Sequence, residues 1–143
     1  MTDTEPTDPA TIDALADATR DSGGDLAAQT TLWGAMFGLE KWWFIARGTL
    51  PEVAPVVGVV DGLPSLLAFT SGARARECAL AMGFGEEEAG QVLAVAPQSV
   101  LETTDHLMSQ GVQRLVVDQG VLGFFAPLGQ LRPIAEFISR SRG

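Results

Sequence analysis

The stretch Leu63-Pro64-Ser65-Leu66-Leu67-Ala68-Phe69-Thr70-Ser71-Gly72-Ala73-Arg74-Ala75 decides the fold, because its pattern predicts a strand, a turn and a helix. Leu66 to Phe69 is continuously apolar, which is typical of a strand covered on both faces. Thr70 or Ser71 can cap the helix by accepting bonds from its first free N–H groups. That helix has apolar side chains at helical spacing and ends at Gly83; they are Ala75, Cys78, Ala79 and Met82.

Two further strands are predicted before this unit. The aromatic and branched residues of 41–47 favour a strand, and Pro55 to Val60 is a second one. Asp61-Gly62 is a strong hairpin signal between the second strand and the central one. We therefore expect an antiparallel meander of three strands.

After the central helix, strands are expected at 91–96 and 113–118. Ser99 and Glu102 match a capping box, which predicts that a helix opens between these strands. Residues 124–127 lead to a last helix, with Pro133 in its first turn and with Ile134, Phe137 and Ile138 facing inward. The order predicts an α/β (α+β) fold in which a mixed sheet of about five strands continues from the meander through helical crossovers.

The first 25 residues differ in composition from the rest. They hold seven of the 18 acidic residues and one basic residue, Arg20. This favours a flexible acidic tail over residues 1–25 and a single α/β domain over 26–143. A short helix over Thr11 to Arg20, with Ile12, Leu15 and Ala16 inward, stays open. Asp25 is a plausible N-cap for the next helix.

The formal net charge of −9 argues against nucleic acid and anionic membranes as partners. The only cysteine, Cys78, fits a reducing compartment. No signal peptide and no apolar run long enough to span a membrane is evident. We therefore expect a cytoplasmic protein.

One edge of the predicted sheet is a candidate ligand site. If the strands that end near residues 69, 96 and 117 run parallel, their carboxyl ends lie together, and ligands of open α/β sheets favour such an edge. Free N–H groups at the helix N-termini there suit a small anion. In the alternative, Ser71 merely caps the helix and Arg74 pairs with Asp118 or points into water. The candidate residues are Thr70, Ser71, Arg74, Gln98, Asp118 and Gln119.

No catalytic motif accompanies this edge. The serines lack a Gly-x-Ser-x-Gly context, and the only histidine, His106, follows Glu102 by four residues, which predicts an exposed helical pair. One cysteine and one histidine are too few for a zinc site. We expect no cofactor, no metal and no enzymatic activity.

The three tryptophans leave two interpretations open. Trp42 and Trp43 lie on a predicted edge strand, where aromatic side chains often form a contact surface. Alternatively, these residues and Trp33 are core side chains beneath the first helix.

The segment Phe69-Thr70-Ser71, followed by Arg74-Ala75, resembles the N-terminal domain of the SseB family, which is named for type III secretion and enhanced serine sensitivity. In that family a strand ends in Phe-Thr, and a helix opens with Arg-Ala after a short turn. Val116 to Gly120 is similar to a later family strand that closes in Asn-Pro-Gly, although this chain has Asp-Gln-Gly. The resemblance spans about residues 26–138. It implies a mixed α/β fold without established enzymatic activity.

These features favour a non-catalytic module that binds a protein partner, a second copy of itself as a homodimer, or a small ligand. The alternative is an anion-binding regulator or an enzyme that uses Thr70, Arg74 and Asp118.

Overall fold

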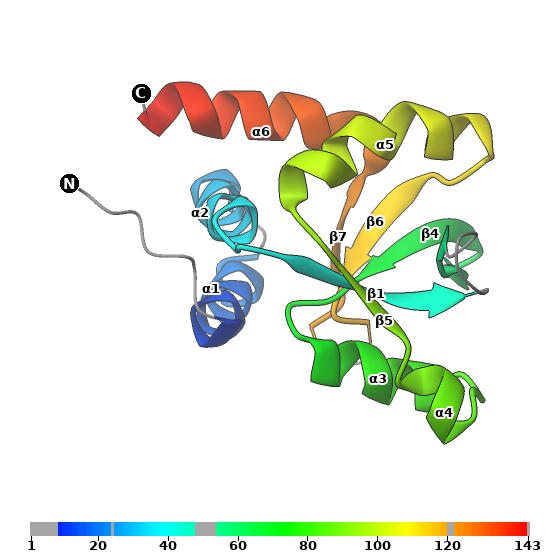
Figure 1. The fold of residues 1–143 in the computed structure, drawn as a ribbon. Coiled ribbons are helices and arrows are strands. Elements are labelled where there is room, and N and C mark those ends of the chain that lie inside the picture. Colours follow the sequence, from blue (N-terminus) through cyan, green and yellow to red (C-terminus); the bar gives the residue numbers. More distant parts are fainter. Residues whose placement is uncertain (1–8, 24, 48–53, 120–121, 143) are drawn as a thin grey trace.

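The computed structural model describes residues 9–23, 25–47, 54–119 and 122–142. Along the described chain, two helices are followed by four strands, two helices, a strand, a helix, two strands and a last helix (Figure 1). The helices are α1 (Pro9–Asp21), α2 (Leu26–Phe37), α3 (Gly72–Ala81), α4 (Glu86–Ala89), α5 (Pro97–Ser109) and α6 (Leu128–Arg142). The strands are β1 (Trp42–Arg47), β2 (Ala54–Pro55), β3 (Val57–Val60), β4 (Leu63–Ala68), β5 (Val92–Val95), β6 (Arg114–Val117) and β7 (Phe124–Pro127).

Strand β4 is central to a four-stranded sheet with the order β3-β4-β6-β7. It pairs antiparallel with β3 and parallel with β6, while β6 pairs antiparallel with β7. Asp61 and Gly62 both have positive φ angles in the tight turn that joins β3 to β4, as the hairpin signal predicts. The α/β class with mixed strand pairing is confirmed.

A second sheet has the order β2-β1-β5, with both pairs antiparallel. The two sheets meet where the backbones of Trp43 and Phe69 exchange two hydrogen bonds of 2.8 and 2.9 Å. The predicted meander is therefore only partly correct, because β2 pairs with β1 whereas β3 pairs with β4. Strand β5 reaches β1 rather than β4.

The side chains of β4 alternate between two hydrophobic cores, as a strand covered on both faces requires. Leu66 and Ala68 face the larger core, which contains side chains of α1, α2, α5 and α6. Leu67 faces the smaller core under α3 and α4. Figure 1 shows α5 and α6 on one side of the strands and α3 and α4 on the other.

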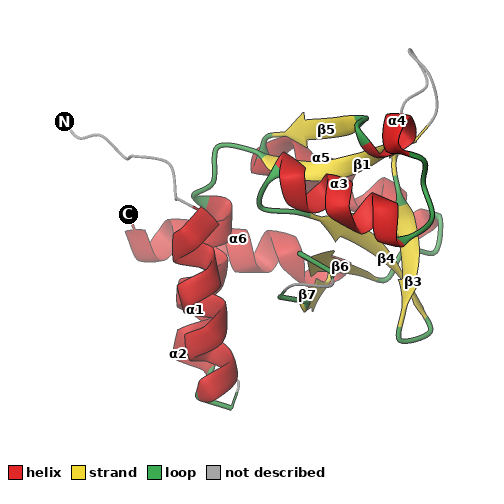
Figure 2. Ribbon diagram, turned by 90° about the horizontal axis from the view of Figure 1, so that it is seen from below, coloured by secondary structure: helices red, strands yellow, loops and turns green. Residues whose placement is uncertain are grey.

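Residues 9–21 form helix α1 and differ from the flexible tail expected for residues 1–25. The sequence left undecided whether a short helix forms here. The helix does form, and Ile12 is fully buried and Ala16 nearly so on its inward face. Helices α1 and α2 stand together at one end of the sheet (Figure 2). The N-cap prediction for α2 is correct, because the Asp25 carboxylate accepts a 3.1 Å hydrogen bond from the Ala28 N–H.

Two local features were not predicted correctly. Residues 124–127 form the strand β7. Helix α5 starts at Pro97, so Ser99 is not its N-cap. No helix in the described part of the chain is long and apolar enough to cross a membrane.

Candidate functional site

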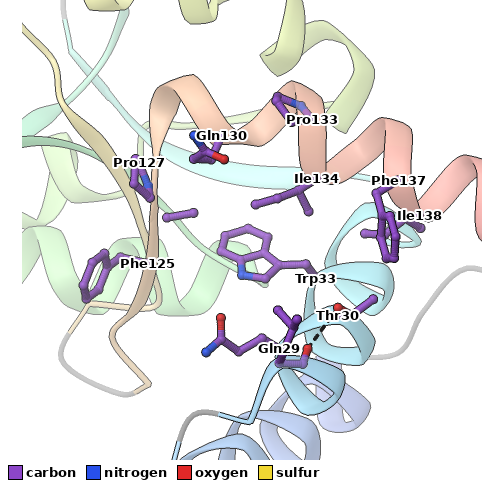
Figure 3. A pocket seen from close by; sticks show the side chains of 12 residues that line it. Gln29, Thr30, Trp33, Phe125, Pro127, Gln130, Pro133, Ile134, Phe137 and Ile138 are labelled. Carbon is purple, nitrogen blue, oxygen red and sulfur yellow. Dashed lines mark hydrogen bonds between the residues drawn. The ribbon is translucent and has the colours of Figure 1, made fainter.

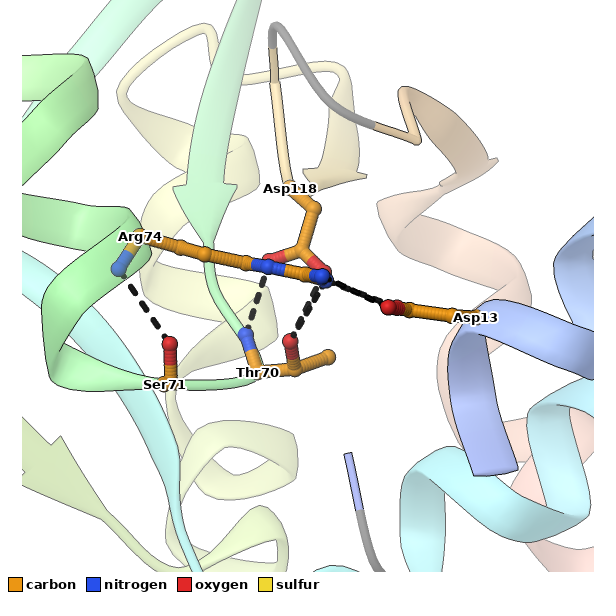
Figure 4. A network of polar contacts seen from close by, with 5 residues as sticks. All are labelled: Asp13, Thr70, Ser71, Arg74 and Asp118. Carbon is orange, nitrogen blue, oxygen red and sulfur yellow. Dashed lines mark hydrogen bonds and ion pairs between the residues drawn. The ribbon is translucent and has the colours of Figure 1, made fainter. Parts of the chain in front are cut away.

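Asp118 lies at the end of the sheet where the parallel strands β4 and β6 finish (Figure 4). Its side chain is completely buried, and its backbone has a φ angle of +51°. One carboxylate oxygen accepts a 2.8 Å hydrogen bond from the Thr70 N–H, and the other accepts one of 2.8 Å from the Thr70 hydroxyl. The buried carboxylate therefore fastens the turn after β4 to the end of β6.

Arg74 is held between Asp118 and a second carboxylate that comes from α1. Its Nη1 donates to Oδ2 of Asp118 at 2.7 Å, and its two terminal nitrogens form a fork on Asp13 at 2.8 and 2.7 Å. Hydrogen bonding to Asp13, the largest effect, and then to Asp118 raises the pKa of Arg74 above its ordinary value, against the opposing effect of burial. Arg74 is thus permanently charged and joins three segments of the chain.

Because these polar groups already bond one another, few of them are free to bind a ligand at the predicted edge of the sheet. Ser71 caps α3, because its hydroxyl oxygen accepts a 3.2 Å hydrogen bond from the Arg74 N–H. Two carboxylates surround one guanidinium, so the cluster of Asp13, Arg74 and Asp118 carries a formal charge of −1. An incoming anion would have to displace Asp13. Both parts of the alternative interpretation, a capping serine and an Arg74–Asp118 pair, are therefore observed.

Two of the predicted edge residues do not join this network. Gln98 is exposed in the first turn of α5 and lines a shallow depression against α6, with Ala135 and Ser139. It lies elsewhere because β5 pairs with β1 and so does not lie beside β4. Gln119 is half-buried in the turn after Asp118, but it contributes no bond to the network among the described residues.

Trp42 is fully buried, which corrects its assignment to a contact surface. Its indole N–H donates a 2.8 Å hydrogen bond to the carbonyl oxygen of Met36, and its ring packs against Phe37. Trp43 is half-buried over the start of α3, where a Cβ atom at Gly72 would lie 3.2 Å from the indole ring. The core interpretation therefore holds for Trp42 and for Trp33, which is only 6% exposed, and Trp43 packs on α3.

An open groove lies between α2, β7 and α6, and we call it the Trp33 groove (Figure 3). Its volume is about 460 Å³, and none of its lining side chains is charged. The indole of Trp33 lies between the helices and β7, with an edge-on contact to Phe124. The lining residues are Leu26, Gln29, Thr30, Trp33, Phe125, Ala126, Pro127, Gln130, Pro133, Ile134, Phe137 and Ile138.

Large apolar side chains are exposed around this groove. Leu26, Phe125 and Phe137 have exposed fractions of 78, 54 and 51%. Ile138 is buried and Ile134 packs against the core, as predicted, but Phe137, which was also expected to face inward, is exposed. The groove was missed because α2 is distant in sequence from β7 and α6, and because β7 was not recognised.

No group of three or more His, Cys, Asp or Glu side chains in the described ranges is placed to hold a metal ion. Burial raises the pKa of the Cys78 thiol, which makes it a weak nucleophile at neutral pH.

Comparisons of the chain with models of protein families, with curated proteins and with solved structures gave no match.

Proposed function

We propose that this protein is a non-catalytic protein-interaction module and that the Trp33 groove is its binding surface. The observation that carries the proposal is the clustering of exposed apolar side chains. The described residues include seven exposed large hydrophobic side chains, and Leu26, Phe125 and Phe137 lie at this one groove. Contiguous apolar surface of this kind is characteristic of sites that bind other proteins.

The proposed occupant is an apolar, uncharged segment of a partner protein that lies along β7. Among the described strands, β7 pairs only with β6, so its outer edge is free to pair with another strand. A segment added there would form backbone hydrogen bonds and place alternate side chains against Trp33. The absence of charged side chains from the lining favours an uncharged segment.

The alternative anion-binding function receives less support from the geometry. Arg74, the cation on which that function depends, already faces Asp13 and Asp118. We also propose that the protein works in a reducing compartment, such as the cytoplasm, and that its resemblance to the SseB family reflects a true relationship. The single free thiol of Cys78 is consistent with that compartment.

The proposal is tested by comparing Phe137→Glu with Met82→Glu, because both wild-type side chains are exposed but only Phe137 lines the groove. Partners are captured with the full chain from a cell extract, and each candidate is then purified and titrated. We expect a purified partner to bind the wild type and Met82→Glu, and to bind Phe137→Glu at least about tenfold more weakly, a loss of 1.4 kcal/mol.

Light scattering on the same three proteins tests self-association. A dimer that Phe137→Glu dissociates would identify the partner segment as one from a second copy of the chain. The proposal would be overturned by equal binding to both variants, or by a monomer for which no purified partner shows a groove-dependent affinity.

A further inference from the structure

A second hollow lies beneath α5, at the place where the two sheets separate. Its volume is about 350 Å³, and it shares no lining residue with the Trp33 groove. Strands of both sheets supply its apolar walls, which consist of Phe44, Pro55, Val57, Leu66, Leu93 and Val95. This volume is near the lower end of the range of about 300–1,000 Å³ that is usual for small-molecule sites.

One wall of this α5 hollow differs from the others because it is polar. Ser99, Thr103, His106 and Gln110 line it, with spacings of four, three and four residues along the chain. Side chains at these spacings lie on one face of a helix. The apolar lining residues Val100 and Leu107 flank this stripe, so the polar groups border an apolar interior.

Three members of the stripe have unused hydrogen-bonding groups. Thr103 donates a 2.8 Å hydrogen bond to the carbonyl oxygen of Val100. The side chains of Ser99, His106 and Gln110 make no hydrogen bond within the described part of the molecule, and His106 forms no ion pair with Glu102 there. Each of the three can donate a hydrogen bond. Ser99 lies about 10 Å along the helix from His106, so only His106 and Gln110, about 6 Å apart, can bond one small acceptor group together.

We propose that the α5 hollow binds a small molecule with an apolar body and a carboxylate head. The aliphatic and aromatic walls take the body, and the imidazole of His106 and the amide of Gln110, about one helical turn apart, take the carboxylate oxygens. No acidic side chain lines the hollow, so no lining charge opposes such an anion. This site is independent of the protein-binding groove.

Octanoate is a suitable probe, and the NMR signals of the His106 ring are a suitable readout. His106 is the only histidine of the chain, so its ring signals need no further assignment. We expect octanoate to shift these signals saturably. The absence of a saturable shift would overturn the proposal.

Val57 and Val59 provide a matched pair of variants on β3. Both side chains are exposed and lie on the same face of the strand, but only Val57 lines the hollow. Val57→Phe fills the hollow and is expected to weaken octanoate binding at least about tenfold, whereas Val59→Phe leaves it unchanged. Equal effects of the two variants, with thermal melting showing both to be folded, would contradict the assignment.

The carboxylate head is tested with 1-octanol, which has the same apolar chain and a neutral head. We expect 1-octanol to bind at least about tenfold more weakly, because hydrogen bonds to a charged acceptor are stronger. Equal affinity for octanoate and 1-octanol would refute the role given to the donors of α5.

Discussion

The polar cluster at the end of the sheet and the Trp33 groove differ in whether their side chains already have partners. At the sheet end, Asp118, Thr70 and Arg74 satisfy one another, and Asp13 completes the cluster from α1. At the groove, Phe125 and Phe137 face solvent although they are large and apolar. A position at which ligands often bind in related folds is thus not sufficient evidence of a binding site. The decisive question is whether the polar groups at that position already have partners.

The strongest test of this contrast is the replacement of Asp118 by alanine. Removal of one member of a buried ion pair costs about 3–5 kcal/mol, and the N–H of Thr70 also loses its acceptor. Denaturant unfolding should therefore show a loss of this size. Asp105→Ala, which removes an exposed carboxylate 3.7 Å from Arg132, should change the free energy of unfolding by less than about 1 kcal/mol. Similar losses in both variants would contradict a structural role for Asp118.

A second large effect is expected from Ile12→Ala in α1. Ile12 is fully buried, and removal of a buried aliphatic side chain of this size costs about 2–5 kcal/mol. The control is Thr11→Ala, because Thr11 is exposed on the same helix. Thermal and denaturant unfolding that does not distinguish the two variants would show that α1 is not part of the cooperative fold.

Asp13→Asn should have a smaller effect that depends on salt. Asp13 is partly exposed, so breaking its pair with Arg74 should cost about 1 kcal/mol or less. The cost should fall in 1 M salt, where the screening length is about 3 Å. Asp17→Asn makes the same change of charge on α1 but removes only an exposed pair with Arg20, and its cost should be smaller at low salt.

The smallest effect on stability is expected at the groove. Phe137→Ser replaces a half-exposed ring and should change the free energy of unfolding by no more than about 0.5 kcal/mol. Denaturant unfolding measures this directly. A loss above 2 kcal/mol would mean that Phe137 is a core residue, and the contrast between an open groove and a closed cluster would fail.

The strand, turn and helix around Thr70 could be predicted because each signal is local. The apolar run marks β4, Ser71 caps α3, and parallel pairing of β4 with β6 brings Asp118 to Thr70. By contrast, Asp13 and Arg74 are 61 residues apart, and no periodicity connects them. Their contact depends on how α1 docks on the finished fold.

Strand β7 was missed for a different reason. It is only four residues long and ends at Pro127, which has no N–H for a sheet hydrogen bond. Without β7 the sheet edge beside Trp33 could not be placed, and the groove could not be inferred. Phe137 was expected to face inward because of its spacing from Ile134, but the buried stripe of α6 runs through Leu131 and Ile138.

Because α1 is bonded to residues that are distant in sequence, the order of synthesis limits when these contacts can form. Helix α1 emerges from the ribosome before Arg74 and Asp118, to which it is tied through Asp13. A helix of 13 residues is only marginally stable alone in water. The contacts that α1 makes through Asp13 can therefore form only after most of the described chain has been synthesised.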